Sequence, residues 1–301
     1  MVKSTDFIAL ATASLKNDKD CVRNICKVLA SREKEGSQLK RNLNNLLSKF
    51  SNDGQHQINL VELNPKIKGL VYSVSSDVTV EDLALSSVIV EKVTTFIQEI
   101  KQKDQLADYG FSNSNKVMLS GPSGCGKTSL AIALSNELEL PLYVLDFTQV
   151  ISSFLGTTGA KLADVFRNLP SPCVLLVDEI DTVLTERSNQ QTNKSDCGEA
   201  ARIVTTLLIE IERLNSDIVL VGATNHPQML DSAVGRRFDT HLCFEAPDSK
   251  IRQQWYSKFI QSKQNVEWDK LNIDLSTGNS IAELKLHVES VAKAWVLKQV
   301  C

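Results

Sequence analysis

Residues 121–128 read GPSGCGKT, a glycine-rich segment that satisfies the phosphate-loop pattern G-x-x-x-x-G-K-[S/T]. In this pattern the glycines let the main chain curl around phosphate groups, and the N–H groups of the loop form an anion-binding nest. Lys127 would bring its charge to the β and γ phosphates of ATP, and Thr128 would offer its hydroxyl to Mg²⁺. A β-rich stretch precedes the loop and helix-forming residues follow it, so a phosphate site is a better interpretation than a plain glycine turn. The residues expected to form this site are Gly121, Pro122, Ser123, Gly124, Cys125, Gly126, Lys127, Thr128 and Ser129.

Three carboxylates follow an apolar run within residues 173–181, which read CVLLVDEID. Such a run is typical of a buried strand, and the carboxyl ends of parallel strands face the ligand crevice of an α/β fold. Asp178 would then lie beside the phosphate loop and hold Mg²⁺ through water, and Glu179 would be the general base for the attacking water. The alternative is an acidic cap at the start of a helix, which Asp178, Glu179 and Asp181 would also suit. The phosphate loop in the same chain favours the catalytic interpretation.

The elements that would position these residues alternate along the middle of the chain. Between residues 86 and 223, apolar residues at helical spacing alternate with short β-rich runs, which is typical of a parallel sheet with helices on both faces. The expected fold class is therefore α/β, with a P-loop NTPase-type parallel sheet. The predicted helices are 86–102, 127–138, 159–169 and 199–214, and the predicted strands are 116–120, 142–146, 173–178 and 218–223.

Helical patterns on both sides of this region predict further domains. Residues 1–60 repeat apolar residues on one helical face, and helices at 249–261 and 281–300 predict a small helical lid. The polar, turn-rich stretch 51–57 and the segment up to Asp77 predict a connection with some extended structure. The expected division is a helical partner- or substrate-binding domain at 1–60, a linker at 61–75, the large α/β domain at 76–246 and the lid at 247–301.

The composition and the charge exclude several classes of protein. Hydrophobic residues make up 42% of the chain and charged residues 23%, which excludes collagen-like, low-complexity and wholly disordered chains. With 33 basic and 36 acidic residues the formal charge is −3, which argues against a surface built to grip nucleic acid. Residues 1–68 carry 12 basic and 7 acidic residues, and either a solvated helical surface or an acidic partner would explain this basic head.

Cysteine usage and hydropathy bear on the compartment. The seven cysteines are scattered, with no CxxC pair and no cluster with histidine, which fits reduced thiols in the cytoplasm better than disulfides or a metal site. No apolar run approaches the roughly 18 residues that a membrane-spanning helix needs. The apolar stretch 7–13 resembles a signal peptide only loosely, because Asp6 stands where positive charge is expected, and we interpret it as part of a core helix.

Two further segments resemble motifs of the AAA subgroup of the AAA+ ATPases, and the resemblance covers residues 76–295. The segment IVLVGATNHP is similar to the sensor-1 strand of that family, which implies that Asn225 orients the attacking water. The segment DSAVGRRFD is similar to the arginine-finger segment, which implies that Arg236 and Arg237 project into the site of a neighbouring subunit. There the two guanidiniums would stabilise charge on the transferred phosphoryl group. Without the resemblance, a surface salt-bridge pair is the more usual interpretation of two adjacent arginines.

The resemblance extends to a substrate-gripping loop and to the lid. Phe154, Leu155 and Gly156 stand where the family has its pore loop, which implies sequence-tolerant contact with an extended polypeptide, although a core phenylalanine is the alternative. The segment TGNSIAELKLHVESV is similar to the lid motif of the family. It has Ala282 where many other AAA+ groups carry a sensor-2 arginine, and it implies that Asn279 lies near the ribose.

Two positions of the phosphate loop depart from the family pattern. Ser123 and Cys125 replace the commoner proline and threonine, while the glycines, the lysine and the threonine that bind phosphate and Mg²⁺ are kept. ATP binding is therefore expected to survive. A reactive thiolate at Cys125 would make the site sensitive to oxidation.

The resemblance implies a homo-oligomer, expected to be a hexamer, that hydrolyses ATP with Mg²⁺ at its subunit interfaces. Such rings remodel, unfold or translocate a protein substrate, here recruited by the N-terminal helices. Because the chain has no HExxH motif, it would release the substrate or deliver it to a separate protease or other effector. The alternative is an ATP-controlled assembly scaffold or switch that threads no polypeptide. The modest basic head gives little support to a third interpretation, a nucleic-acid ATPase.

Overall fold

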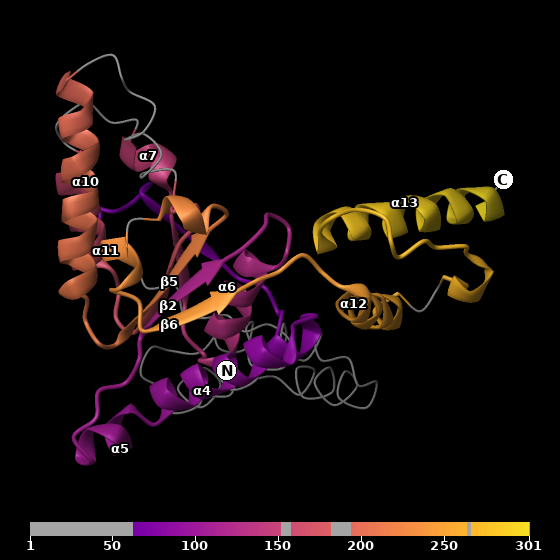
Figure 1. Cartoon of the computed structure of the whole chain (residues 1–301), viewed down its shortest axis with the longest axis horizontal. Helices are drawn as coiled ribbons and strands as arrows, with labels where there is room; N and C mark the ends of the chain where they lie inside the picture. The colour runs from indigo at the N-terminus through magenta and orange to yellow at the C-terminus, as the bar shows by residue number, and fades with distance from the viewer. Residues whose placement is uncertain (1–62, 152–157, 182–193, 231, 264–265, 301) are drawn as a thin grey trace, which may run out of the picture. The chain divides into compact units, whose positions relative to one another are not determined.

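The structure is a computed structural model, and it describes residues 63–151, 158–181, 194–230, 232–263 and 266–300 (Figure 1). The chain divides into two units, residues 1–57 and 58–301, and all described residues belong to the second unit. The helical domain predicted at 1–60 and the pore loop predicted at 154–156 lie outside the described residues.

A six-stranded sheet with the order β1-β3-β4-β5-β2-β6 forms the centre of the second unit. All neighbouring strands are parallel except β1, which pairs antiparallel with β3 at one edge. The α/β fold predicted from the sequence is therefore confirmed, and the four predicted strands lie within one residue of their expected bounds. The strands are β1 Val71–Val74, β2 Lys116–Ser120, β3 Leu142–Leu145, β4 Cys173–Val177, β5 Ile218–Thr224 and β6 Thr240–Cys243.

The two edge strands, β1 and β6, were not among the predicted strands. β1 lies in the segment 61–75 that was expected to link two domains. That segment joins the sheet because its apolar residues Ile67, Leu70 and Val71 are buried in the core. In β6 only Leu242 is buried, so its sequence lacks the continuous apolar run of the inner strands.

Helices cover both faces of the sheet, and each face has its own hydrophobic core. Along β4 the side chains of Cys173, Leu175 and Val177 enter one core, which contains residues of α7, α8 and α10. Val174 and Leu176 enter the other core, which contains residues of α4 and α6. All residues of β3, β4 and β5 are buried, which explains why these strands read as unbroken apolar runs.

The helices follow the predicted pattern closely. Ser86 caps the N-terminus of α4, where its Oγ accepts a hydrogen bond from the N–H of Ile89, and Asp248 caps α12 in the same way. The helix predicted at 199–214 begins earlier, at Lys194. The α-helices are α4 Ser87–Lys101, α5 Lys103–Asp108, α6 Lys127–Glu137, α7 Phe147–Ile151, α8 Thr158–Asn168, α10 Lys194–Glu212, α11 Ser232–Gly235, α12 Ser249–Gln261 and α13 Ile281–Val300, and the 3₁₀ helices are η1 Val80–Asp82, η2 Pro227–Met229 and η3 Trp268–Lys270.

The helices α12 and α13 follow the last strand and pack against each other (Figure 1). In α13 the buried stripe consists of Leu284, Val288 and Ala292, which are spaced at helical intervals. In α12 the ring of Trp255 stacks on that of Phe259, with a centroid distance of 4.9 Å. No helix in the described ranges is long and apolar enough to span a bilayer.

Candidate functional site

The loop between β2 and α6 has the shape that phosphate binding needs. Gly121 and Gly124 have φ angles of 139° and 74°, in the region that favours glycine. A Cβ at Gly121 would lie 2.1 Å from the carbonyl oxygen of Phe244, and one at Gly124 would lie 2.8 Å from Oγ of Ser280. Any side chain at these two positions would therefore clash with Phe244, just after β6, or with Ser280, just before α13.

Lys127 opens α6, and its side chain is buried beneath the loop. Its Nζ donates hydrogen bonds to the carbonyl oxygens of Gly121 at 2.7 Å and Pro122 at 2.8 Å, and to Oδ1 of Asn225 at 2.7 Å. Burial lowers the pKa of the Lys127 ammonium, and the charges of nearby acidic groups act in the opposite direction. A buried ammonium whose three acceptors are neutral oxygens is suited to an anionic ligand such as a phosphate group.

Thr128 and Asp178, the two expected Mg²⁺ ligands, lie in contact. The hydroxyl of Thr128 donates a hydrogen bond to Oδ2 of Asp178 at 2.8 Å, and Oδ1 of Asp178 accepts one from the N–H of Glu179 at 2.9 Å. Hydroxyl and carboxylate oxygens are the ligands that Mg²⁺ prefers, so this donor pair fits the ion. Elsewhere, the described residues contain no group of three or more His, Cys, Asp or Glu side chains that could hold a metal.

Glu179 and Asn225 follow two neighbouring strands at the same edge of the sheet. Glu179 is exposed and has a φ of 50°, a conformation that non-glycine residues rarely adopt. Asn225 follows β5 and reaches Lys127, as described above. The parallel strands β4, β5 and β2 are adjacent. Their carboxyl ends therefore bring Asp178 and Glu179, the amide of Asn225 and the phosphate loop together. The helix required by the alternative, capping interpretation of the acidic residues would begin within 182–193, outside the described residues.

The start of α13 touches the phosphate loop. The N–H of Ala282 donates a hydrogen bond to the carbonyl oxygen of Gly124 at 3.1 Å. Asn279, which was expected near the ribose, is exposed and does not line the cavity described next. Its N–H instead donates to Oε2 of Glu283 at 2.7 Å.

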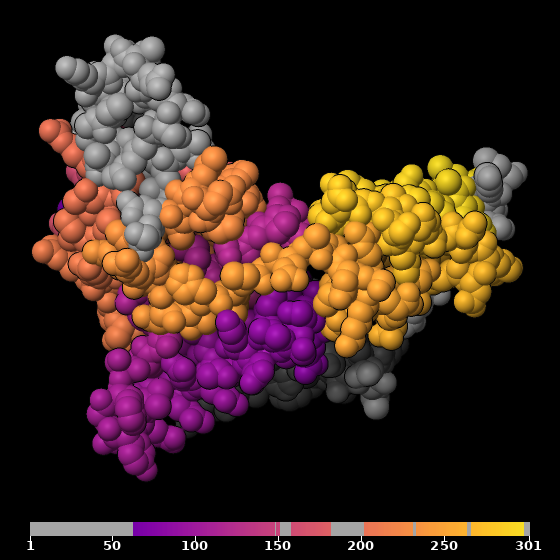
Figure 2. Space-filling view, viewed as in Figure 1, coloured from indigo at the N-terminus to yellow at the C-terminus, as the bar shows by residue number. Residues whose placement is uncertain are grey.

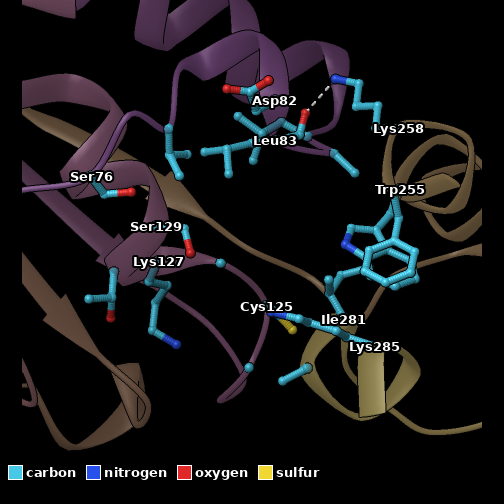
Figure 3. A pocket seen from close by; sticks show the side chains of 18 of the residues that line it. Ser76, Asp82, Leu83, Cys125, Lys127, Ser129, Trp255, Lys258, Ile281 and Lys285 are labelled. Atoms are coloured by element: carbon cyan, nitrogen blue, oxygen red, sulfur yellow. Dashed lines mark hydrogen bonds between the residues drawn. The ribbon is translucent and has the colours of Figure 1, made fainter. Parts of the chain in front are cut away.

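A cavity of about 940 Å³ opens between the phosphate loop, the segment that precedes α4 and the helices α12 and α13. This volume lies within the range of small-molecule sites. The surface is indented there (Figure 2), and Lys127, Cys125, Trp255 and Ile281 surround the space (Figure 3). Lys258 lines it from α12 and donates hydrogen bonds to the carbonyl oxygens of Glu81 and Leu83, the latter at 2.9 Å (Figure 3).

The cavity residues of the segment before α4 and of α12 were not predicted from the sequence. The spacing of Trp255 and Phe259, four residues apart on a predicted helix, could have indicated one aromatic face. The bond from Lys258 to the segment before α4 joins residues more than 170 positions apart, and no local pattern predicts it.

Cys125 lies inside the loop, and its thiol is buried. Burial raises the pKa of the Cys125 thiol, while the charge of Lys127 opposes that shift. The neutral thiol is therefore favoured, and this weakens the expectation of an oxidation-sensitive thiolate.

Arg236 and Arg237 lie outside the cavity of their own chain. Arg236 is exposed. Arg237 is tied down, because its guanidinium donates to the carbonyl oxygen of Ala233 at 2.7 Å and forms an ion pair with Glu212 at 2.8 Å.

The residues that follow the two arginines anchor them to the sheet. Phe238 is buried in the core that contains α8 and α10. Oδ2 of Asp239 accepts hydrogen bonds from the N–H groups of Asn115 and Lys116, each at 3.1 Å, at the start of β2. The arginines therefore stand on a fixed segment, with only Arg236 turned to solvent.

Comparison with known proteins agrees with this geometry. Residues 117–246 match the family described as "ATPase family associated with various cellular activities (AAA)". An uncharacterized AAA family ATPase of Sinorhizobium fredii is 30% identical over 223 residues, which cover 72% of this chain and 65% of that protein. A putative 26S proteasome regulatory subunit homolog of Methanothermobacter marburgensis is 29% identical over 228 residues, which cover 73% of this chain and 59% of that protein.

The ATP-dependent zinc metalloprotease FtsH of Thermus thermophilus is 31% identical over 195 residues, which cover 63% of this chain and 31% of that protein. The chain thus spans less than two thirds of the length of each of these three relatives. The sheet with its phosphate loop after β2, the acidic end of β4 and these matches lead to one conclusion: the chain belongs to the AAA+ ATPase family.

Proposed function

We propose that the protein is an Mg²⁺-dependent ATPase that acts on a protein substrate as a ring of identical subunits. The observation that carries the ATPase part is the meeting of Lys127, Thr128, Asp178 and Asn225 at the ends of three adjacent parallel strands. That arrangement combines a buried cation, a hydroxyl–carboxylate pair and a neutral amide around one glycine loop. These are the groups that phosphoryl transfer from ATP to water requires.

Each of these side chains would have its own role in ATP hydrolysis. Lys127 and the N–H groups of the loop bind the phosphates. Thr128 and Asp178 hold Mg²⁺, which when bound supplies Lewis-acid stabilisation of the phosphate charge. Asn225 orients the attacking water, and Glu179 accepts its proton as the water oxygen forms the new P–O bond and the bond to ADP breaks.

The remaining positive charge would come from a neighbouring copy. Arg236 and Arg237 lie outside their own cavity on an anchored segment, and the exposed guanidinium of Arg236 is available to another subunit. A planar cation delivered to the phosphoryl group would stabilise its charge as it is transferred. Such a contact is head-to-tail and closes into a ring, for which we propose six subunits.

The protein-remodelling part of the proposal has independent support. Two of the relatives are named as a putative proteasome regulatory subunit homolog and as an ATP-dependent protease. Residues 1–60 would recruit the substrate, and Phe154, Leu155 and Gly156 would contact it as an extended polypeptide. We place this activity in the cytoplasm, where the protein would release its substrate or pass it to a separate protease or other effector.

The ATPase proposal is tested with two variants of the full chain. Lys127→Ala should lose ATP binding, because it removes the buried cation. Glu179→Gln should keep ATP binding and lose turnover by on the order of a thousandfold, because the amide cannot accept the proton. Lys101→Ala, on the exposed end of α4, is the matched control. Unchanged ATP affinity in Lys127→Ala would contradict the proposal.

Remodelling is tested separately with a substrate trapped by the Glu179→Gln variant and identified by mass spectrometry. Phe154→Ala should retain ATP hydrolysis and lose unfolding of that substrate, because the aromatic grip is gone. Undiminished unfolding by Phe154→Ala would instead favour the ATP-controlled scaffold.

A further inference from the structure

Arg252 makes four hydrogen bonds to main-chain carbonyl oxygens from its place on α12. Its Nε donates to Pro247 at 2.9 Å, and Nη1 donates to Leu275 at 3.1 Å and to Thr277 at 3.0 Å. Nη2 donates to Gly278 at 2.7 Å. A single guanidinium therefore ties the stretch before α12 to the loop that leads into α13.

The loop held by Arg252 has little freedom to change shape. Gly278 has a φ of 80°, and a Cβ there would lie 2.7 Å from Cβ of Glu283. The buried Ser280 caps α13, where its Oγ accepts a hydrogen bond from the N–H of Glu283 at 3.2 Å. The carboxylate of Glu283 accepts one in return from the N–H of Asn279. Fixing the carbonyls of Leu275, Thr277 and Gly278 thus fixes the start of α13.

The start of α13 is in turn pressed against the phosphate loop. Ala282 donates its N–H to the carbonyl oxygen of Gly124 at 3.1 Å. A Cβ at Gly124 would lie 2.8 Å from Oγ of Ser280 and 3.0 Å from Cβ of Ala282, so the two segments are in close contact. A shift of the helix start would therefore move the loop, and with it the N–H groups that face a phosphate.

We propose that Arg252 is a positioning residue for the nucleotide site, acting through the 275–278 loop and Ala282 on Gly124. The proposal rests on the proposed ATP site. An arginine is suited to this role because its planar fork of donors reaches several carbonyls at once, which the single ammonium of lysine does not. The same guanidinium sits on the helix that presents Trp255 and Lys258 to the cavity, so it sets two walls of the cavity relative to each other.

The test compares ADP affinity by isothermal titration calorimetry in the full chain and in Arg252→Gln and Arg252→Lys variants. Arg252→Gln should bind ADP about tenfold more weakly, a change of one decade in Kd. It should also raise KM for ATP by more than it lowers kcat, and Arg252→Lys should restore only part of the affinity. Arg167→Gln is the matched control, since that arginine pairs with the buried Glu210 between α8 and α10, far from the lid in sequence. It should lower Tm without changing ADP affinity.

A second variant removes the last link of the chain of contacts. Ala282→Pro lacks the N–H that reaches Gly124, and proline is tolerated in the first turn of a helix. It should weaken ADP binding as Arg252→Gln does, and it decides the question if Arg252→Gln does not fold. ADP affinity within twofold of the wild-type value in a folded Arg252→Gln, or in Ala282→Pro, would overturn the proposal. Absence of ADP binding by the wild-type protein would instead contradict the proposed ATP site.

Discussion

At the scale of single residues, Tyr143 offers a test of the packing. Its ring is fully buried in β3, and its hydroxyl has no hydrogen-bond partner in the part of the chain that the structure describes. Because an unpaired buried hydroxyl is destabilising, Tyr143→Phe should raise the free energy of unfolding by about 1 kcal/mol. Urea unfolding measures this change, with Tyr72→Phe as the control on an exposed position of β1. A midpoint for Tyr143→Phe below that of the wild type would contradict the prediction.

The thiol of Cys125 gives a prediction that depends on pH. Its pKa is raised by burial, so at a given pH it holds less thiolate than an ordinary cysteine. Iodoacetamide should therefore label Cys125 more slowly at neutral pH than the exposed Cys243, and the rate should climb as the pH rises toward the raised pKa. Peptide mapping by mass spectrometry follows both cysteines in one sample. Fast labelling of Cys125 at neutral pH would restore the hypothesis of an oxidation-sensitive loop.

At the scale of elements, the packing of Phe238 against β5 fixes the position of the segment that carries Arg236 and Arg237. A Cβ at Gly222 would lie 2.8 Å from Cζ of Phe238, which anchors that segment in the core. Gly222→Ala should therefore lower the free energy of unfolding by about 1 to 3 kcal/mol. Gly235→Ala is the control, since its Cβ would meet neighbours only at 3.9 Å. Equal stability of the two variants in a denaturant titration would count against this packing.

The inner strands could be predicted because burial on both faces leaves one unbroken apolar run in the sequence. The edge strands could not: β1 has two exposed residues of four, and β6 has a single buried residue. What makes each of them a strand is its partner, β3 or β2, which no local pattern reveals.

The site likewise has one part that local sequence patterns predict and one part that they do not. The meeting of Lys127, Thr128 and Asp178 was predictable, because the phosphate loop follows β2, Asp178 follows β4, and the carboxyl ends of parallel strands meet at one edge. The contributions of Lys258 and Arg252 were not, because they act through main-chain carbonyls distant in the sequence. Every residue has a main-chain carbonyl, so a sequence does not indicate which carbonyls Lys258 and Arg252 will bond. Their contributions can be identified only from the folded structure.

At the scale of the whole molecule, the described part of the chain holds the proposed ATP pocket and a pair of arginines that lies outside it. The pocket is lined by residues that follow β2, β4 and β5 and by residues of α12 and α13, whereas Arg236 and Arg237 stand on an anchored segment between β5 and β6. This separation is the physical reason to propose that one copy completes the site of the next. It also predicts that defects on opposite sides of one interface can compensate for each other.

Mixing two inactive variants tests this claim most directly. Arg236→Ala keeps its own pocket and donates no exposed guanidinium, and Glu179→Gln donates the guanidinium and lacks the base, so each alone should have little ATPase activity. In the mixture some interfaces pair an intact pocket with an intact arginine, and steady-state ATP hydrolysis should recover well above the sum of the two separate activities. A mixture no more active than that sum, or an Arg236→Ala variant as active as the wild type, would contradict a site shared between neighbouring copies.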